Sequence, residues 1–167
     1  MLKKALVSIF GMSVHIIEVG KNDLAVFGDK NIISVPYDQL EEKLRELANA
    51  RFLVVDLNDA EKDDFCDEVL YLMEPSAIML NNLVRRKMKI FEELSEKKII
   101  LNKSMLTNRD VTEFESEANT KVFFNIPPLD DRKDNSIIVD LLYKLGINDG
   151  TAAKRGESSK IFGIFRH

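Results

Sequence analysis

Residues 52–56 read FLVVD, four consecutive apolar residues followed by a carboxylate. Such a run without polar alternation is typical of a strand buried on both faces, as in parallel sheets that helices cover on each side. Two similar apolar runs occur at residues 98–101 and 122–126. Because segments with helical spacing separate these runs, we predict an α/β fold: a mostly parallel, doubly wound sheet with helices on both faces.

The helices are predicted from apolar residues spaced three or four positions apart. The first helix follows Asp38, and Leu40, Leu44 and Leu47 form its apolar stripe. Further helices are expected at residues 61–73, 83–94, 107–118 and 137–145, and one more short strand at residues 77–80. Residues 36–146 therefore form the strand–helix units of the sheet.

The first 35 residues have a different character. They contain short β-rich runs, separated by turns rich in Gly, Asn and Asp, at residues 5–10, 14–19, 24–27 and 32–35. Turns of this composition commonly connect antiparallel strands. We therefore expect β-hairpins in residues 1–35, within a single α/β domain of residues 1–146, followed by a flexible tail of residues 147–167.

The composition narrows the class of protein. No apolar run approaches the roughly 18 residues that a membrane span needs. The single cysteine, Cys66, excludes an intrachain disulfide and fits a cytoplasmic protein. The formal net charge of −4 argues against a general nucleic-acid binder. Neither histidine, His15 or His167, has the spacing of a metal ligand, so no metal site is expected.

Polar residues follow several of the predicted strands. They occur at residues 56–59, 81–82, 102–104 and 127–130. Because ligands bind at the carboxyl ends of the strands in a doubly wound sheet, these residues are candidates for one common site. The alternative is that they are the polar residues expected in any surface loop.

Four segments occur in an order that resembles a known family: FLVVD at 52–56, DEVLYLMEPS at 67–76, KIILNK at 98–103 and FFNIPP at 123–128. Their order and spacing over residues 52–146 resemble the second half of the MinD/ParA ATPase superfamily, including the TadZ/CpaE-like pilus-assembly proteins. The resemblance implies that Asp56 matches the acidic residue near the magnesium ion and the attacking water. It also implies that Asn102 reads the adenine edge, and that Ile126 and Pro127 flank the base.

The phosphate-binding part of that family is missing from its expected place. A P-loop surrounds the phosphates with backbone N–H groups of a Gly-rich turn, and a lysine neutralises their charge. No such turn follows residues 5–10, and the only Gly-Lys pair, Gly20-Lys21, is predicted to be a hairpin turn. We therefore expect no catalytic residues and no cofactor. ATP and magnesium would need phosphate contacts from another chain.

The resemblance, together with the missing P-loop, favours a non-catalytic scaffold or localisation module of a membrane-associated assembly, such as a pilus or secretion system. A nucleotide-binding switch completed by another chain is one alternative. A degenerate response-regulator receiver is another, because Asp56 and Lys103 follow strands at suitable places. A receiver also needs an acidic pair after its first strand, and residues 9–11 supply none.

The last residues form an apolar cluster between Lys160 and Arg166. Its members are Ile161, Phe162, Ile164 and Phe165. A short amphipathic segment of this kind predicts weak contact with a protein partner or with the inner face of a membrane. The alternative is that it docks on its own domain, as an edge strand or a hydrophobic tail. Protein partners are expected, among them a second copy of the chain.

Overall fold

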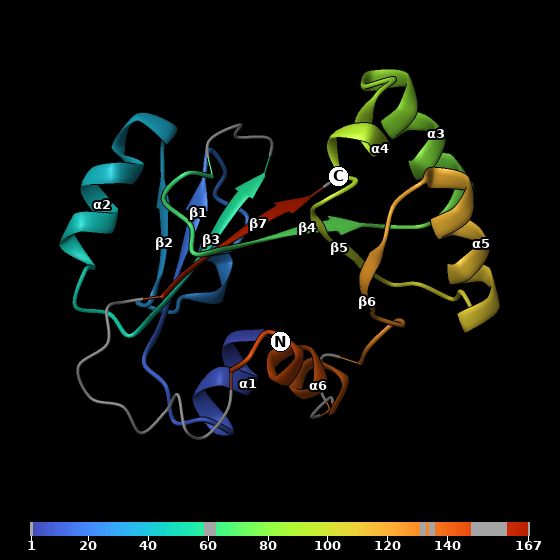
Figure 1. The fold of residues 1–167 in the computed structure, drawn as a ribbon. Helices are drawn as coiled ribbons and strands as arrows, with labels where there is room; N and C mark the ends of the chain where they lie inside the picture. Colours follow the sequence, from blue (N-terminus) through green and yellow to red (C-terminus); the bar gives the residue numbers. More distant parts are fainter. Residues whose placement is uncertain (1, 59–62, 131–132, 134–135, 148–159, 167) are drawn as a thin grey trace.

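Seven parallel strands form one open sheet (Figure 1). The computed structural model describes residues 2–58, 63–130, 133, 136–147 and 160–166. The strands are β1 (Val14–Val19), β2 (Ile32–Val35), β3 (Phe52–Asn58), β4 (Glu68–Met73), β5 (Lys98–Leu101), β6 (Val122–Asn125) and β7 (Lys160–Arg166). Their order across the sheet is β2-β1-β3-β7-β4-β5-β6. The predicted α/β fold with a parallel sheet is confirmed.

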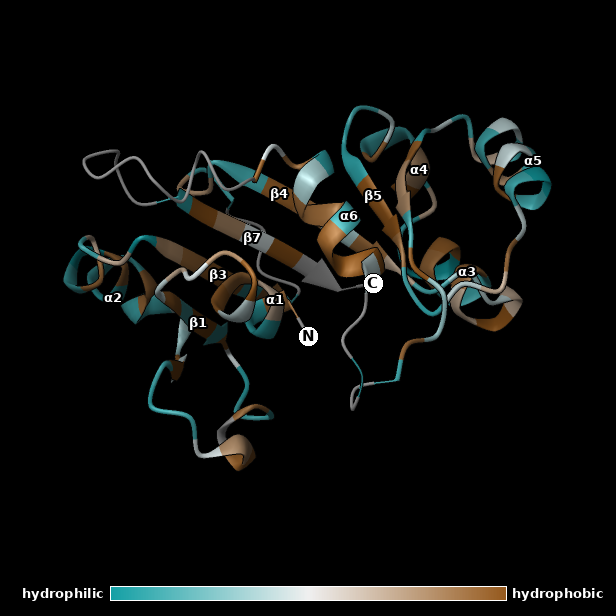
Figure 2. Ribbon diagram, turned by 90° about the horizontal axis from the view of Figure 1, so that it is seen from below, coloured by the Kyte–Doolittle hydropathy of each residue, from teal (hydrophilic) through white to brown (hydrophobic). Residues whose placement is uncertain are grey.

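Helices cover both faces of the sheet, as predicted. They are α1 (Leu2–Ser8), α2 (Leu40–Glu46), α3 (Ala77–Arg86), α4 (Ile90–Glu93), α5 (Asn108–Ala118) and α6 (Ser136–Lys144), with short 3-10 helices η1 (Ala25–Phe27) and η2 (Tyr37–Gln39). Helices α2 to α5 share one apolar core, in which Leu40 and Leu83 are buried. Helices α1 and α6 lie on the other core, through Leu6 and Leu142 (Figures 1 and 2).

Strand β7 comes last in the chain but lies in the middle of the sheet. It pairs with β3 on one side and with β4 on the other, so that Phe162 is opposite both Val54 and Glu68. Asp67 strengthens this junction, because its backbone N–H donates to the Ile161 carbonyl while its carboxylate accepts from the Ile161 N–H. Strands β3 and β4 are therefore joined through β7.

Gly163 lets β7 fit closely against its surroundings. A Cβ atom at this position would lie 2.7 Å from Cys66 Sγ and 2.8 Å from Leu57 Cδ1, well inside van der Waals contact. On the opposite face of the same strand, the Phe162 ring stacks on Phe52 with 4.5 Å between ring centroids. The centre of the sheet is thus filled from both sides, and only glycine fits at position 163 without displacement.

The predicted N-terminal hairpins are wrong. Residues 2–8 form α1, in which Leu2, Ala5 and Leu6 have helical spacing and pack on the α6 side of the sheet. Strands β1 and β2 are parallel, so they cannot be joined by a tight turn, and residues 20–31 form the crossover between them. Residues 25–27 are the 3-10 helix η1. Short apolar runs do not by themselves show which neighbour a strand will pair with.

Two elements in the middle of the chain also differ from the prediction. Residues 68–73 form strand β4, whereas a helix over 61–73 was expected; residues 61–62 lie outside the described part. The sheet buries β4 on both faces, and this continuous apolar segment happens to match helical spacing as well. Residues 77–80 belong to α3, whose N-cap Ser76 accepts a hydrogen bond from the Met79 N–H. Asn81 and Asn82 are therefore on a helix and not at a strand end.

The second half of the chain follows the prediction more closely. Strands β5 and β6 and helix α6 occur where the sequence predicts them. Thr107 caps α5 in a capping box, with Asp110 bonding back to the Thr107 N–H. This cap is a local sequence signal that needs no tertiary contact, which explains its success.

The apolar end of the chain docks on its own domain, as a central strand and not as a free tail. The Phe162 side chain is 3% exposed, and Ile161 and Ile164 pack against the two cores. The prediction of membrane or partner contact is therefore wrong for Ile161, Phe162 and Ile164, whereas the Phe165 side chain lies outside the described part of the structure. Phe165 lies in β7 opposite Asn58. Residues 148–159 of the predicted tail lie outside the described residues.

Substitution of Gly163 by alanine tests this packing. We expect a loss of about 1–3 kcal/mol in the free energy of unfolding, because the new methyl group overpacks the sheet centre. Urea unfolding followed by circular dichroism measures it. Combining the change with Cys66→Ala removes one clashing atom, so the double variant should lose less than the sum of the two single variants. An unchanged unfolding midpoint for Gly163→Ala would contradict the packing described here.

Candidate functional site

The strand order places a topological switch point between β1 and β3. The chain leaves β1 towards β2, then returns through α2 to β3 on the other side of β1. Ligands of doubly wound sheets bind at such points, beyond the carboxyl ends of the strands. Glu18 of β1 and Asp56 of β3 are register partners here. The fold therefore predicts a ligand site at this edge of the sheet.

The Glu18 carboxylate is hydrogen-bonded to the loop that follows β1. The side chain is 2% exposed, and its carboxylate accepts from the backbone N–H groups of Asp23 at 3.1 Å and Leu24 at 3.2 Å. It also accepts from the Ser34 hydroxyl of β2 at 3.1 Å. Three donors satisfy a buried carboxylate, so Glu18 acts as an anchor for the β1–β2 crossover.

Asn58 and Lys21 make a second set of internal contacts. The Asn58 side-chain amide donates to the Val19 carbonyl at 2.8 Å, and its oxygen accepts from the Lys21 ammonium at 2.7 Å. Gly20, with φ +70°, provides the turn that brings Lys21 back over the strand ends. The cation of the Gly20-Lys21 pair is therefore held by an amide of the same molecule.

The residues predicted for nucleotide binding are not brought together. Asp56 is 3% exposed and lies between Glu18 and Ile164 in the sheet. Asn102 follows β5, three strands away from β3, which corresponds to about 14 Å at the usual strand spacing. Ile126 lies beside the Asn102 loop, since its carbonyl accepts from the Ser104 N–H at 2.8 Å. Pro127 follows Ile126 and is partly exposed.

The loop after β5 is also held by internal hydrogen bonds. Lys103 has the left-handed φ of 52°, and its ammonium lies 3.8 Å from Glu74. The buried Ser104 hydroxyl accepts from the Leu106 N–H, and the Asn125 amide donates to the Leu106 carbonyl. The polar residues after β5 therefore stabilise a loop, as Glu18 does after β1.

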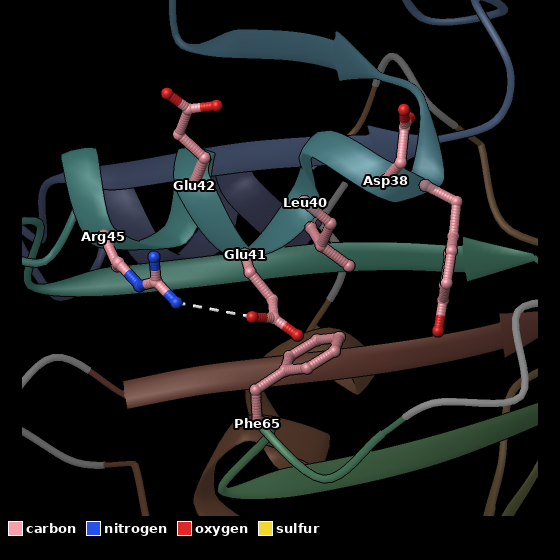
Figure 3. Close-up of a pocket in the computed structure, with 7 residues that line it drawn as sticks. Asp38, Leu40, Glu41, Glu42, Arg45 and Phe65 are labelled. Atoms are coloured by element: carbon pink, nitrogen blue, oxygen red, sulfur yellow. Dashed lines mark hydrogen bonds and ion pairs between the residues drawn. The ribbon is translucent and has the colours of Figure 1, made fainter.

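A pocket of about 320 Å³ lies between η2 and α2, which follow β2, and the loop before β4. We call it the α2 pocket, and its lining residues are Tyr37, Asp38, Leu40, Glu41, Glu42, Arg45 and Phe65. Figure 3 shows Glu41 and Arg45 above the Phe65 ring, joined by an ion pair of 3.4 Å. The Glu41 carboxylate is directed towards Phe65, whereas the carboxylates of Asp38 and Glu42 point to the other side of α2 (Figure 3). Tyr37 and Phe65 make the lining partly aromatic.

The described residues form neither a metal centre nor a reactive thiol. No group of three or more His, Cys, Asp or Glu side chains in the described ranges is arranged to hold a metal ion. Burial, with the nearby carboxylates of Asp63 and Asp67, raises the pKa of the Cys66 thiol to about 12 from 9.0. Burial and the Asp63 carboxylate likewise raise the pKa of Tyr71 to about 12. Both groups stay protonated at neutral pH.

Comparisons with protein-family models, with curated proteins and with solved structures give no match for this chain. Among the helices that the structure describes, none combines the length and apolar character of a membrane span.

Sequence reasoning missed the role of Glu18. Residues 14–19 were expected to be part of a hairpin, where a glutamate in a strand carries no special meaning. A single carboxylate at the end of an apolar strand was the available signal, because such a group needs donors if it is buried. The Lys21–Asn58 contact joins residues far apart in sequence, and no local pattern predicts it.

Replacement of Glu18 by glutamine tests the anchor. The amide nitrogen of glutamine would face an N–H or hydroxyl donor where the carboxylate now accepts, so we expect a loss of about 1–3 kcal/mol in unfolding free energy. Ser34→Ala removes only one of three donors and should cost less. Urea unfolding of both variants gives the comparison. If Ser34→Ala proves more costly than Glu18→Gln, the carboxylate is not the anchor.

Thiol labelling tests the environment of Cys66. With its pKa near 12 in the folded state, the thiol should react with iodoacetamide at pH 8 about two to three orders of magnitude more slowly than in urea. The folded state prefers the protonated thiol, so this contribution to stability is present below pH 9 and is lost as the pH rises towards 12. Equal labelling rates in the folded and unfolded protein would disprove this burial.

Proposed function

We propose that this chain is a non-catalytic scaffold or localisation module similar to MinD/ParA-type proteins, acting at the cytoplasmic side of a membrane-associated assembly such as a pilus or secretion system. Its fold class agrees with that resemblance, which rests on the sequence motifs of residues 52–146. Protein partners would then recognise the surface of the sheet and helices, and no bound cofactor would be required.

One observation carries the non-catalytic part of this proposal: the Lys21 ammonium is bound to the Asn58 amide at 2.7 Å. A phosphate site needs a lysine that faces open space beside free backbone N–H groups. The nearby N–H groups of Asp23 and Leu24 are likewise bound, to Glu18. Asp56 is buried, and Asn102 lies three strands away. The described residues therefore do not fit ATP with magnesium.

A receiver-like signalling domain is the second candidate, and one contact favours it. A receiver needs acidic residues near the end of its first strand, and residues 9–11 supply none. The first strand is in fact Val14–Val19, and its Glu18 is the register partner of Asp56. Two carboxylates on adjacent strands resemble a receiver's metal-binding edge. Against it, Glu18 and Asp56 are 2% and 3% exposed, and a phosphate donor must reach the accepting carboxylate.

Isothermal titration with ATP and with ADP, each with magnesium, tests the main proposal. We expect no binding heat for the wild-type chain, because the groups that would hold phosphate are already bonded internally. Micromolar binding that disappears in Asn102→Ala would instead support a nucleotide switch and overturn the proposal of a non-catalytic module.

The receiver alternative has its own assay. Acetyl phosphate with magnesium should leave the chain unmodified, as judged by intact mass. A mass increase of one phosphoryl group that is absent from Asp56→Asn would establish the receiver function in place of the scaffold.

A further inference from the structure

Two oppositely charged surfaces remain unused by the function proposed above. The first is residues 84–89, VRRKMK, which we call the α3 corner because they end α3 and lead into α4. All six residues are exposed, and Met88, at 86%, is the most exposed of the large apolar side chains that the structure describes. Residues 77–89 contain four basic side chains and no acidic one.

The arginines of the α3 corner are available for a partner. Lys87 and Lys89 lie 3.8 Å and 3.7 Å from Glu93 and Glu92 of α4. Arg85 and Arg86 make no ion pair within the described residues. An exposed guanidinium pair beside an exposed methionine is suited to a surface that offers carboxylates around an apolar contact.

The α2 pocket is such a surface. The two segments that supply its lining, residues 37–46 and 63–68, carry eight acidic side chains and two basic ones. Among these carboxylates, Asp67 is already bonded to the Ile161 N–H and Glu68 to Lys98. Glu41 is paired with Arg45, whereas Asp38 and Glu42 make no ion pair in the part of the chain that is described. Tyr37, Leu40 and Phe65 contribute apolar surface to the lining.

The two surfaces cannot meet within one molecule. Leu40 of α2 and Leu83 of α3 belong to the same core, so both helices lie on one face of the sheet. They lie at opposite ends of that face, however, because α2 leads from β2 into β3 whereas α3 follows β4 and precedes β5 (Figure 1). A second copy of this chain carries both the basic α3 corner and the acidic α2 pocket, so it is the partner that complements each surface.

We propose that the α3 corner of one copy docks in the α2 pocket of the next. Met88 enters the pocket against Phe65 and Tyr37, and Arg85 and Arg86 reach across α2 to pair with Asp38 and Glu42, whose carboxylates lie on the other side of that helix (Figure 3). The scaffold function proposed above does not require this contact, and the contact would hold for a chain of any function.

The dimensions and forces suit the contact. At about 30 Å³ of liquid volume per water molecule, the pocket has room for about ten waters, enough for a long unbranched side chain and part of its neighbour. Methionine is flexible and interacts favourably with aromatic rings. Charge complementarity adds mainly specificity and rate of association, so the contact should be weak and sensitive to salt.

The symmetry of the contact follows from its chemistry. The two docking surfaces are different, so each copy offers one of each, and a single contact between two copies is head-to-tail. Such a contact produces a ring if the rotation closes and an extended filament if it does not. When two copies make the contact twice, each α3 corner in the other's α2 pocket, the result is a closed dimer with twofold symmetry.

Sedimentation velocity at increasing protein concentration tests the proposal. At low salt, we expect species larger than a monomer, which dissociate when sodium chloride is raised from about 0.02 M to about 0.5 M, as screening shortens the reach of exposed charges. The variant Arg85→Glu/Arg86→Glu and the variant Asp38→Lys/Glu42→Lys should each remain monomeric. All four substituted side chains are exposed, so circular dichroism should show a folded protein in each case.

Mixing the two charge-reversed variants is the decisive experiment. Each variant alone meets like charge at the interface, whereas the mixture restores opposite charges in both possible pairings. We expect the equimolar mixture to recover assembly under conditions in which neither variant assembles alone. A general effect of net charge would not produce this recovery.

A matched pair of methionine variants tests the apolar contact. Met88 and Met105 are 86% and 82% exposed. Met88 lies between α3 and α4, which precede β5, whereas Met105 lies in the loop that follows β5. Met88→Asp should raise the concentration needed for assembly about tenfold or more, equivalent to about 1.4 kcal/mol, and Met105→Asp should leave it unchanged.

Three results would overturn the inference. The first is a wild-type chain that stays monomeric at low salt over the whole concentration range. The second is an assembly that both charge-reversed variants retain. The third is a monomer whose Arg85 and Arg86 bind vesicles containing anionic lipid, since a membrane and not a second copy would then occupy the α3 corner.

Discussion

Strand β7 holds the two halves of the sheet together. Strands β3 and β4 make their inner ladders with β7, and the side chains of Ile161, Phe162 and Ile164 extend into the cores on both faces. Without β7, two central strands would expose rows of unpaired N–H and C=O groups, which cost free energy when they are buried. The close contact at Gly163 and the paired bonds of Asp67 follow from this central position.

The central strand also divides the carboxyl edge of the sheet. Glu18, Lys21 and Asn58 lie on the β1–β3 side, whereas Asn102 and Ser104 lie beyond β4. Glu18 accepts from the loop after β1 and from Ser34 of β2, Lys21 donates to Asn58, and the Ser104 hydroxyl accepts from the loop after β5. These polar groups stabilise the crossovers between elements.

The remaining interaction chemistry lies on the helices of one face. The α2 pocket is acidic and partly aromatic, and the α3 corner is basic with an exposed methionine. They lie over different strands of the same face, since α2 leads from β2 into β3 and α3 follows β4, so they meet between copies and not within one copy. A scaffold built in this way would combine a rigid sheet with a salt-sensitive means of self-association.

Local sequence alone determined the elements whose signals are complete within a few residues. These include the capping box of Thr107 and Asp110, the amphipathic α6 and the apolar strands β3 and β5, and together they establish the α/β class. Only tertiary structure decided that residues 2–8 are helical, that β1 and β2 are parallel, and that residues 160–166 form the central strand. Strand pairing, the Glu18 anchor and the Lys21–Asn58 contact depend on groups distant in sequence, and hydrophobic periodicity carries no information about which distant partner completes a ladder or a hydrogen bond.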